Sequence, residues 1–459
     1  MTILSPKRWL ISLILIMSIA QTGFSFTEQD PSAQLSHDTK LKQYEGFIIR
    51  QIEIRGNEKT KSYIVRIILN LKEGDSFVPE RFRRSIQRLW NTDSFYSIRY
   101  EVIPLDGRDL KIIVTVKDKW SLLPIISFRS GGGVTRFRAG FKESNLFGEL
   151  KELGAVYENI SGEHFVSIWY EDRYFLETHI RFRVNLFSHG FVDTFYNSNR
   201  DTLLQLITRA DGGSVEFHFP IVEDLLKLSF TYSVFREQID RNAFLNDPTK
   251  NTNEFINFRS VDEVITKTFI QLTLGTIDLL EDYYHQGQEL SLSFEFSDRD
   301  LLSDESFVYI KLDGRIFIIL KDDVTMGHHL ALWTSSTNTF YRKYFLGGFN
   351  NLRGFLGTRF HGDNLYFYNF EIRIPFFKGD FWFIKDFVGI AVPFFDIGYA
   401  WDGDYLGKNT FDNYAADVGL GLRFKIRRIR DAQFRIDFAF SLHPNEMDTF
   451  ISTGLLHFF

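Results

Sequence analysis

The chain has 459 residues, more than one ordinary domain, and its 50 phenylalanines set its composition apart. A net charge of -6 gives no sign of nucleic-acid binding, and a sequence without cysteine excludes disulfides, thiolate metal sites and a lipoprotein anchor. A mean hydropathy of -0.14 excludes a polytopic helical membrane protein, but it is compatible with a membrane β-barrel, whose lipid-facing residues alternate with polar ones.

The first 25 residues have the pattern of a cleaved export signal. Two basic residues precede an apolar stretch from Trp9 to Ala20, and residues 23–25 form a small-x-small cleavage site. The apolar stretch is short for a membrane span, so a signal anchor is the less favoured alternative. Residues 1–25 are therefore predicted to be a signal peptide and residues 26–45 a polar periplasmic linker. No later run approaches the length of a membrane helix, so any later crossing must use strands.

Residues 46–119 are predicted to form a compact β-α-α-β-β unit. Apolar residues at helical spacing indicate a first helix, capped by Thr60 and ended by Gly74, and Pro79 is placed to begin a second. The expected strands are residues 47–55, 95–103 and 110–116.

Arginines lie along one side of the predicted second helix, at Arg81, Arg84 and Arg88. Such a side fits contact with anionic lipid headgroups or with a partner, and a solvated helix face is the alternative. The sequence does not decide between these interpretations.

From Trp120 onward the chain alternates with a period of two. In residues 226–232, for example, leucine, phenylalanine and tyrosine alternate with lysine, serine and threonine. About 16 such runs occupy residues 121–459, and closed antiparallel barrels need an even number. A soluble sandwich would also alternate, but its apolar faces would seldom carry so many phenylalanines. The predicted fold is mainly β: a transmembrane antiparallel β-barrel of about 16 strands over residues 120–459, preceded by one small α+β domain.

The stretch from 341 to 363 is dense in Gly, Asn and aromatic residues and has Arg353 near its centre. A loop this long is usually functional or disordered, and its aromatics argue against disorder. We predict that it folds back into the barrel, with Gly354 supplying a φ that a β-carbon forbids. An arginine in such a confined space needs a carboxylate, and the candidates are Glu371 and Asp396.

These residues carry a resemblance to a known family. An arginine-glycine-aromatic loop (Arg353, Gly354, Phe355), then an acid in the next strand, then an aromatic-x-Asp-x-Gly strand resembles the POTRA-plus-barrel superfamily of outer-membrane barrel-assembly and two-partner-secretion proteins. The family usually has Val before the arginine, where this chain has Leu352. The resemblance implies a loop clamp made by Arg353, Gly354, Phe355, Glu371, Phe394, Asp396 and Gly398.

Both ends of the chain extend the resemblance. Residues 46–119 resemble a single POTRA domain, and the final strand, with Gly454 and Phe459, resembles the C-terminal signal of barrel proteins. The family mechanism implies a weak lateral seam between the first and last barrel strands. Pro124 and the glycines at 131–133 would make the first strand a poor hydrogen-bonding partner.

The resemblance implies a bacterial outer-membrane protein that assembles or inserts other outer-membrane proteins, with its POTRA domain in the periplasm. Client strands would pair with the POTRA sheet edge and the lateral seam. The implied partners are the lipid bilayer and unfolded outer-membrane protein clients, with periplasmic chaperones or accessory lipoproteins as further candidates and no nucleic acid. Two alternatives remain: a two-partner-type protein-secretion pore and a structural surface-antigen barrel.

The sequence indicates no enzyme. His328 and His329 are adjacent in a predicted strand, so they point to opposite faces and cannot chelate one metal together. The sequence contains no phosphate loop and no nucleophile elbow. We therefore expect no catalytic residue, no cofactor and no metal.

Overall fold

The computed structural model describes residues 41–131, 134–160, 162–196, 202–241, 259–281, 283–337, 339–348, 351–355, 359–403, 414–443 and 449–455. The predicted signal peptide and most of the predicted linker lie outside these residues. Among the described residues, no helix is both long and apolar enough to cross a membrane.

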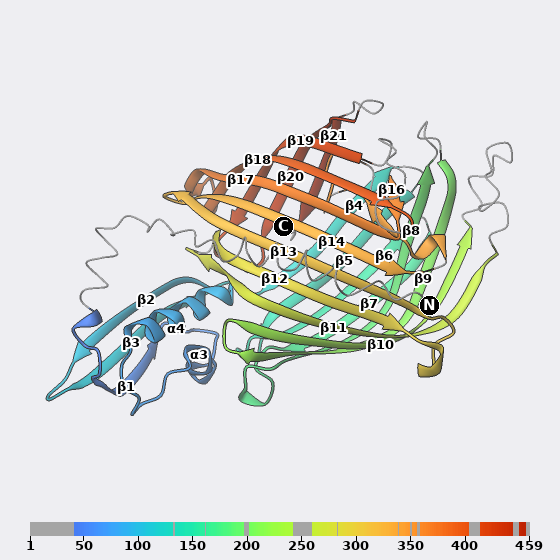
Figure 1. Ribbon diagram of the computed structural model, residues 1–459. Coiled ribbons are helices and arrows are strands. Elements are labelled where there is room, and N and C mark those ends of the chain that lie inside the picture. The colour runs from blue at the N-terminus through green and yellow to red at the C-terminus, as the bar shows by residue number, and fades with distance from the viewer. Residues whose placement is uncertain are drawn as a thin grey trace, which may run out of the picture.

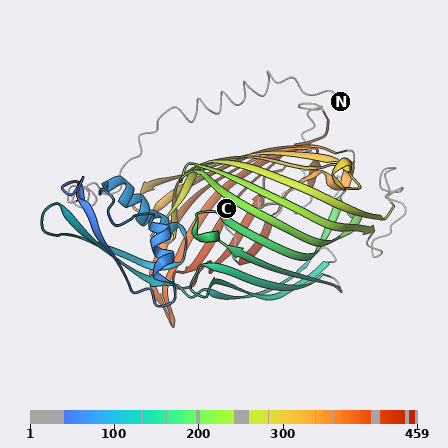
Figure 2. The ribbon, with the colours of Figure 1, turned by 90° about the horizontal axis from the view of Figure 1, so that it is seen from below.

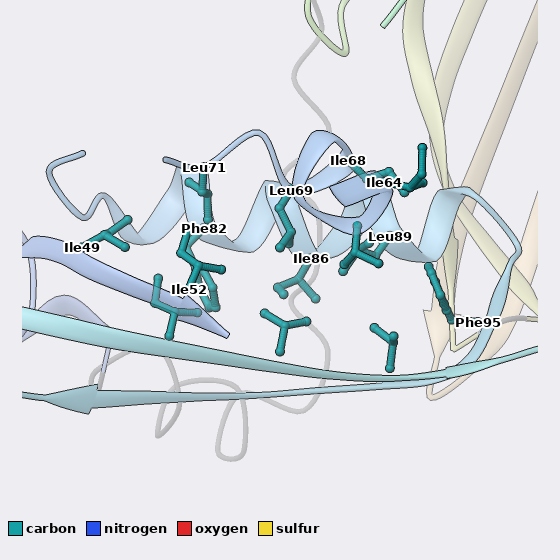
Figure 3. Packing of buried hydrophobic residues seen from close by; sticks show 14 of the residues in the cluster. Ile49, Ile52, Ile64, Ile68, Leu69, Leu71, Phe82, Ile86, Leu89 and Phe95 are labelled. Carbon is teal, nitrogen blue, oxygen red and sulfur yellow. The ribbon is translucent and has the colours of Figure 1, made fainter. Parts of the chain in front are cut away.

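The N-terminal domain has the predicted β-α-α-β-β order. Its elements are β1 (Ile48–Arg55), α3 (Ser62–Leu69), α4 (Pro79–Asn91), β2 (Phe95–Pro104) and β3 (Asp109–Asp118). The sheet order is β1-β3-β2, with β1 parallel and β2 antiparallel to β3. Apolar residues of both helices, including Phe82 and Leu89, pack on one face of this sheet (Figure 3). Each such side chain stabilises the fold by about 1.5–3 kcal/mol, so this face forms a core of its own.

The ends of α3 differ from the prediction. Lys61 is its N-cap and makes no capping bond through its side chain. Thr60 instead donates from Oγ1 to Asp118 Oδ1 at 2.5 Å, because the chain before the helix turns towards the end of β3. The helix ends before Asn70, whose φ of 50° is left-handed, and not at Gly74. Asparagine tolerates this conformation better than most residues, so it ends the helix earlier.

Most of the described residues after 121 form a 16-stranded antiparallel sheet, which agrees with the predicted barrel of about 16 strands. Its strands are β4 (Leu122–Gly131), β5 (Val134–Leu146), β6 (Lys151–Ile160), β7 (Glu163–Asp172), β8 (Arg181–Tyr196), β9 (Thr202–Val222), β10 (Leu226–Arg241), β11 (Val261–Leu280), β12 (Tyr284–Ser297), β13 (Phe307–Lys321), β14 (Val324–Ser336), β17 (Asn364–Phe381), β18 (Ile384–Trp401), β19 (Tyr414–Ile426), β20 (Gln433–Ser441) and β21 (Thr449–Leu455). Strands that follow one another in the chain are neighbours in the sheet. This includes β14 and β17, which pair although a long loop connects them. The sheet curls into a barrel with the N-terminal domain at one end (Figures 1 and 2).

Alternation along each strand separates an apolar outside from a polar inside. On β10, Phe230 and Tyr232 are exposed, whereas Ser229 before them and Ser233 after them are buried. The exposed side chains point away from the barrel, so apolar atoms cover its outer surface. This distribution is the reverse of that in a water-soluble barrel and is typical of one surrounded by lipid.

The two edge strands of the sheet, β4 and β21, each have one partner among the described residues: β5 and β20. Pro124 of β4 lies opposite Phe141 of β5, and Gly454 of β21 lies opposite Arg435 of β20. Phe459 and the glycines at 132 and 133 lie outside the described residues. At the end nearest the N-terminal domain, the backbone of Trp120 bonds Arg428 at 2.7 Å and Arg430 at 2.9 Å. The β19–β20 turn therefore ties the start of β4 to the other side of the seam.

Candidate functional site

The loop between β14 and β17 lies inside the barrel. It contains a short 3-10 turn, η3 (Phe340–Arg342), and a small hairpin of β15 (Tyr344–Leu346) and β16 (Phe360–Gly362). Leu352 is fully buried, and Arg353 is only 3% exposed. The centre of the loop contacts β17, β18 and β19. We call residues 337–363 the inward loop.

Arg353 binds both predicted carboxylates, but unequally. Its Nε donates to Asp396 Oδ2 and its Nη2 to Asp396 Oδ1, each at 2.7 Å, so this pair is bidentate. Its Nη1 donates to Glu371 Oε2 at 3.2 Å. Both carboxylates are buried, and such charge-assisted forks are among the strongest hydrogen bonds in proteins. The guanidinium is thereby fixed in orientation as well as in position.

Phe394 supplies the third contact of the guanidinium. Arg353 Cζ lies 3.5 Å from the centroid of the Phe394 ring, so the cation stacks on its face. Phe394 and Asp396 are two residues apart in β18, and therefore point to the same side of the sheet. The aromatic-x-Asp spacing of the sequence thus provides one surface for stacking and one for hydrogen bonding.

The structure corrects the role predicted for Gly354. Its φ is not in the left-handed range, so the conformation does not require glycine. What requires it is a close approach, because a β-carbon there would lie 2.6 Å from Asp417 Cβ. The Gly354 backbone N–H also donates to Asp417 Oδ2 at 2.9 Å.

We expect Gly354→Ala to unseat the loop, because the added methyl group overlaps the Asp417 side chain. The expected cost is about 1–3 kcal/mol, as for other overpacked sites. The temperature at which the compact band of the folded protein disappears from a gel measures this loss of stability. Gly314→Ala in β13 is the control, since its β-carbon would meet only Leu290 Cδ1 at 3.6 Å. Equal melting of both variants would contradict the close-approach explanation.

The remaining predicted residues, Phe355 and Gly398, seat the loop by packing. Phe355 is 3% exposed and belongs to an apolar cluster with Leu346, Leu352 and residues of β17 to β19. Gly398 lies beneath Leu346, whose methyl groups come within 3.0–3.1 Å of where a β-carbon would be. Close packing of the loop on β18 therefore depends on the small residue in the aromatic-x-Asp-x-Gly pattern.

Polar residues on the neighbouring strands complete the site. Asn369 on β17, Asp396 on β18 and Asp417 on β19 are aligned by strand register. Asn369 Nδ2 donates to Asp396 Oδ1 at 2.7 Å and to the loop carbonyl of Asn351 at 2.6 Å. Asp417 was not among the predicted site residues. Its position on the polar face of a strand was visible in the sequence, but its alignment with Asp396 depends on the hairpin register.

Comparison with known proteins decides the family. Residues 145–454, more than half of the chain, match the Omp85 superfamily domain, and residues 47–119 match the surface antigen variable number repeat, a POTRA domain. The chain belongs to the Omp85 superfamily. Its barrel therefore lies in the outer membrane and its POTRA domain on the periplasmic side, so the turns that contact this domain are periplasmic.

Curated Omp85 relatives are longer than this chain. It is 23% identical over 439 residues to the outer membrane protein assembly factor BamA of Nitratidesulfovibrio vulgaris, covering 88% of this chain and 51% of that protein. It is 22% identical over 411 residues to the protein of the same name from Neorickettsia risticii, covering 84% and 51%. The chain thus spans about half the length of the curated relatives it matches.

Solved structures share the fold of this Omp85 chain. CdiB from Escherichia coli has a TM-score of 0.60 at 12% identity, covering 93% of this chain and 78% of that one. BamA from Haemophilus ducreyi lacking POTRA domains 1–3 has a TM-score of 0.52 at 16% identity, covering 89% and 84%. At these identities the likeness concerns the fold.

Arg84 and Arg88 of α4 bind the barrel itself. Arg84 Nη1 donates to Asp278 at 2.7 Å, and Arg88 Nε and Nη2 donate to Asp224 at 2.9 and 2.8 Å. Asp224 lies in the β9–β10 periplasmic turn, and Asp278 is near the end of β11. Arg81 instead contacts the Asn70 carbonyl within the POTRA domain. Arg84 and Arg88 are therefore engaged by the barrel of the same chain, a contact that the sequence did not predict.

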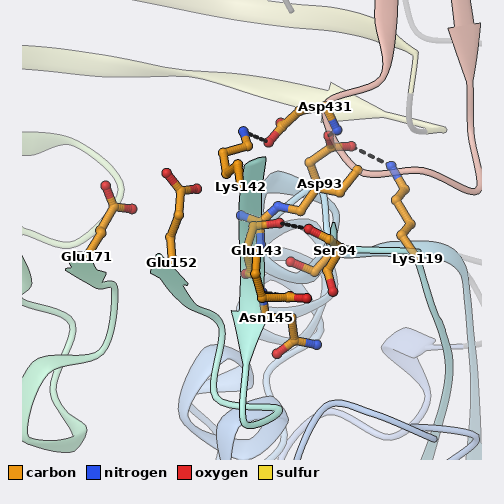
Figure 4. Close-up of polar contacts among 12 residues, drawn as sticks. Asp93, Ser94, Lys119, Lys142, Glu143, Asn145, Glu152, Glu171 and Asp431 are labelled. Carbon is orange, nitrogen blue, oxygen red and sulfur yellow. Dashed lines mark hydrogen bonds and ion pairs between the residues drawn. The ribbon is translucent and has the colours of Figure 1, made fainter. Parts of the chain in front are cut away.

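The POTRA domain also meets the β19–β20 turn. Asp93, just after α4, binds Lys119 Nζ at 2.5 Å and accepts from the Asp431 backbone N–H at 3.2 Å. Asp431 in turn binds Lys142 of β5 at 2.6 Å (Figure 4). The POTRA domain is therefore joined to the periplasmic rim at two places. One is the β9–β10 turn with the end of β11, and the other is the β19–β20 turn beneath the seam.

The docked position should depend on acid pH. Hydrogen bonds from Lys151 and Lys61 lower the pKa of Glu149, in the β5–β6 turn, to about 2. Burial raises the pKa of Asp224, but the hydrogen bond of Arg88 and the charges of Arg84 and Arg88 outweigh it and lower this pKa. Lys151 lies in the barrel beside Glu149, so only the Lys61 bond and the contacts of Arg84 and Arg88 link these pKa values to docking. That part of the lowering stabilises the docked state at pH values above the usual carboxyl pKa, and the stabilisation is lost as pH falls through the lowered pKa.

We therefore expect docking to be constant near neutral pH and to weaken as pH falls from 4.5 towards 2. Because the sequence has no cysteine, a pair introduced at Gln87 and Leu279 would report docking by its disulfide yield after rapid oxidation with iodine. The native Gln87 Nε2 lies 2.8 Å from the Leu279 carbonyl oxygen. Glu149→Gln with Asp224→Asn should flatten this profile, and an unchanged profile would contradict the assignment.

Proposed function

We propose that this Omp85 chain assembles outer-membrane proteins by pairing client strands with its POTRA sheet edge and its barrel seam. The observation that carries the proposal is the state of the edge strands: β4 pairs with β5 and β21 with β20, and the described residues contain no pairing between β4 and β21. An edge strand presents backbone N–H and C=O groups that a client strand can satisfy. In lipid, such groups must be paired, so a client entering at the seam would avoid their exposure.

The inward loop would act as a support for the barrel during this process. Arg353 joins the loop to β17 and β18, and Gly354 joins it to β19. These strands lie close to the β21 edge in the sheet order. The clamp would keep the C-terminal wall in shape while the seam accepts a client. The relatives' name, outer membrane protein assembly factor, agrees with this function.

A photo-crosslinking amino acid at Ile126 tests the proposal. Ile126 is an exposed residue of β4, and Phe230 is an exposed residue of β10, far from the seam in sheet order. During client synthesis, we expect adducts with unfolded outer-membrane proteins at position 126 and few at position 230. Depletion of the chain should lower the amounts of those same proteins in the outer membrane. Equal adducts at both positions, or an unchanged outer-membrane proteome, would reject the seam mechanism.

A secretion pore is the second candidate, and the fold likeness to CdiB favours considering it. A pore would need an open lumen, but the inward loop occupies the barrel interior and the POTRA domain is docked on the periplasmic rim. A large steady conductance in planar bilayers would favour the pore. So would adducts between a secreted protein and a photo-crosslinking amino acid at a lumenal position such as Ser233. Periplasmic chaperones and accessory lipoproteins are proposed partners, and adducts captured at exposed POTRA positions such as Ile103 would identify them.

A further inference from the structure

The beginning of the inward loop is held at a second place, distant along the sheet from the Arg353 clamp. Arg342, in η3, has only 9% of its side chain exposed. Its Nη2 binds Glu237 of β10 at 2.5 Å, and its Nε binds Glu305, which precedes β13. Glu263 of β11 lies 3.6 Å from Nη2. Arg342 therefore joins the loop to three segments of another part of the wall.

Aromatic residues fix the orientation of the Arg342 guanidinium. Its Cζ lies 5.1 Å from the Phe307 ring centroid and 5.6 Å from that of Tyr341. The Tyr309 hydroxyl donates to the Arg342 carbonyl oxygen at 2.7 Å, so the backbone is held as well. A planar cation that stacks on rings and donates to two carboxylates is a role that lysine cannot reproduce.

Apolar packing reinforces this contact. Phe340, Tyr341 and Phe345 of the loop pack against a buried cluster on β9 and β10. The cluster consists of Leu204, Leu206 and Ile239. The first part of the loop is thus seated on the wall by both charge and apolar contact.

The two seats lie on different parts of the barrel wall. Arg342 contacts β10, β11 and the segment before β13, whereas Arg353 contacts β17 and β18. In the sheet, β12, β13 and β14 separate β11 from β17. We propose that Arg342 is a second anchor, which makes the inward loop a tie across the lumen and positions Arg353 for its own clamp. The functional part of this proposal rests on the assembly role proposed above, but the anchor itself does not.

The charges around Arg342 explain why the anchor needs this cation. Glu237, Glu263 and Glu305 surround it, so its removal leaves like charges facing one another in a confined space. The loop would then lose its attraction to the wall and meet repulsion from it. Neutralising one of the three glutamates should relieve that repulsion without restoring the bonds that Arg342 makes to Glu237 and Glu305.

Limited trypsin digestion of the purified, folded protein tests the anchor. Cleavage after Lys343 or Arg359, within the loop, reports local opening. We expect Arg342→Ala to speed this cleavage at least about tenfold and Arg342→Lys to give an intermediate rate. Arg236→Ala is the matched control, because it removes an exposed pair with Asp262 immediately beside Glu237 and should leave the rate unchanged.

A second variant separates positioning from folding. Arg342→Gln combined with Glu305→Gln reduces the charge conflict, so the barrel should regain normal heat-modifiability while loop cleavage stays fast. If Arg342 positions Arg353, the two residues act on the same opening of the loop. Adding Arg342→Ala to Arg353→Ala should therefore increase the rate of loop cleavage by less than Arg342→Ala does in the wild-type protein. Wild-type cleavage in both Arg342 variants would overturn the proposal. Fast cleavage with normal client assembly would keep the anchor and reject its link to the proposed function.

Discussion

Replacing Arg353 by alanine is expected to destabilise the barrel by about 3–5 kcal/mol, the usual cost of removing one partner from a buried ion pair. Asp396 and Glu371 are 0% and 1% exposed, so neither can recover its lost hydrogen bonds from water without opening the site. The loop would lose the stacking on Phe394 at the same time. We expect an earlier loss of the compact band on heating and, on the assembly role proposed above, slower assembly of clients in cells.

Conservative variants separate charge from geometry at this site. Arg353→Lys keeps the charge but cannot donate to both Asp396 oxygens in one plane, so an intermediate loss is expected. Asp396→Asn keeps the shape, and we expect a larger effect than for Glu371→Gln, because Asp396 takes the bidentate bond. Arg353→Ala with unchanged heat-modifiability and full complementation would show that the clamp is not needed.

The strand pattern was predictable because it depends on neighbours in the chain. Alternation at a period of two predicted about 16 strands and their polar faces, and most hairpin turns are short. The pairing of Arg353 with Glu371 or Asp396 followed from the need of a buried cation for an acid. The preference for Asp396 did not, because both acids point to the lumen and only the path of the loop decides between them.

Contacts between distant segments were not predictable. Asp417 comes beside Gly354 only once β17, β18 and β19 are in register, and no local spacing reveals a close approach of that kind. The expected left-handed φ of Gly354 was wrong for the same reason: a glycine can be needed for space as well as for conformation. Likewise, Arg342 is an ordinary surface residue by pattern, and its three glutamates come from separate parts of the chain.

Reversing the charges of Arg84 and Arg88 together is expected to undock the POTRA domain. Each arginine binds an aspartate at 2.7–2.9 Å, and all four side chains are partly buried. Glutamates at both positions would face Asp224 and Asp278 at short range, and such like-charge contacts cost several kcal/mol. The disulfide yield of cysteines at Gln87 and Leu279 should therefore fall about tenfold or more, since about 1.4 kcal/mol already gives a factor of ten.

Exchanging the charges on both sides tests whether the loss is electrostatic. Asp224→Arg and Asp278→Arg, added to Arg84→Glu and Arg88→Glu, should restore much of the disulfide yield, because opposite charges again face each other. Arg81→Glu is the control, since Arg81 contacts Asn70 and Asp75 within the POTRA domain. A yield that stays low in the exchanged protein would mean that the helix docks mainly through shape and through contacts such as that of the Asn91 side chain with the Leu279 backbone N–H. A yield that survives the first reversal would mean that the contacts beneath the seam suffice to hold the domain in place.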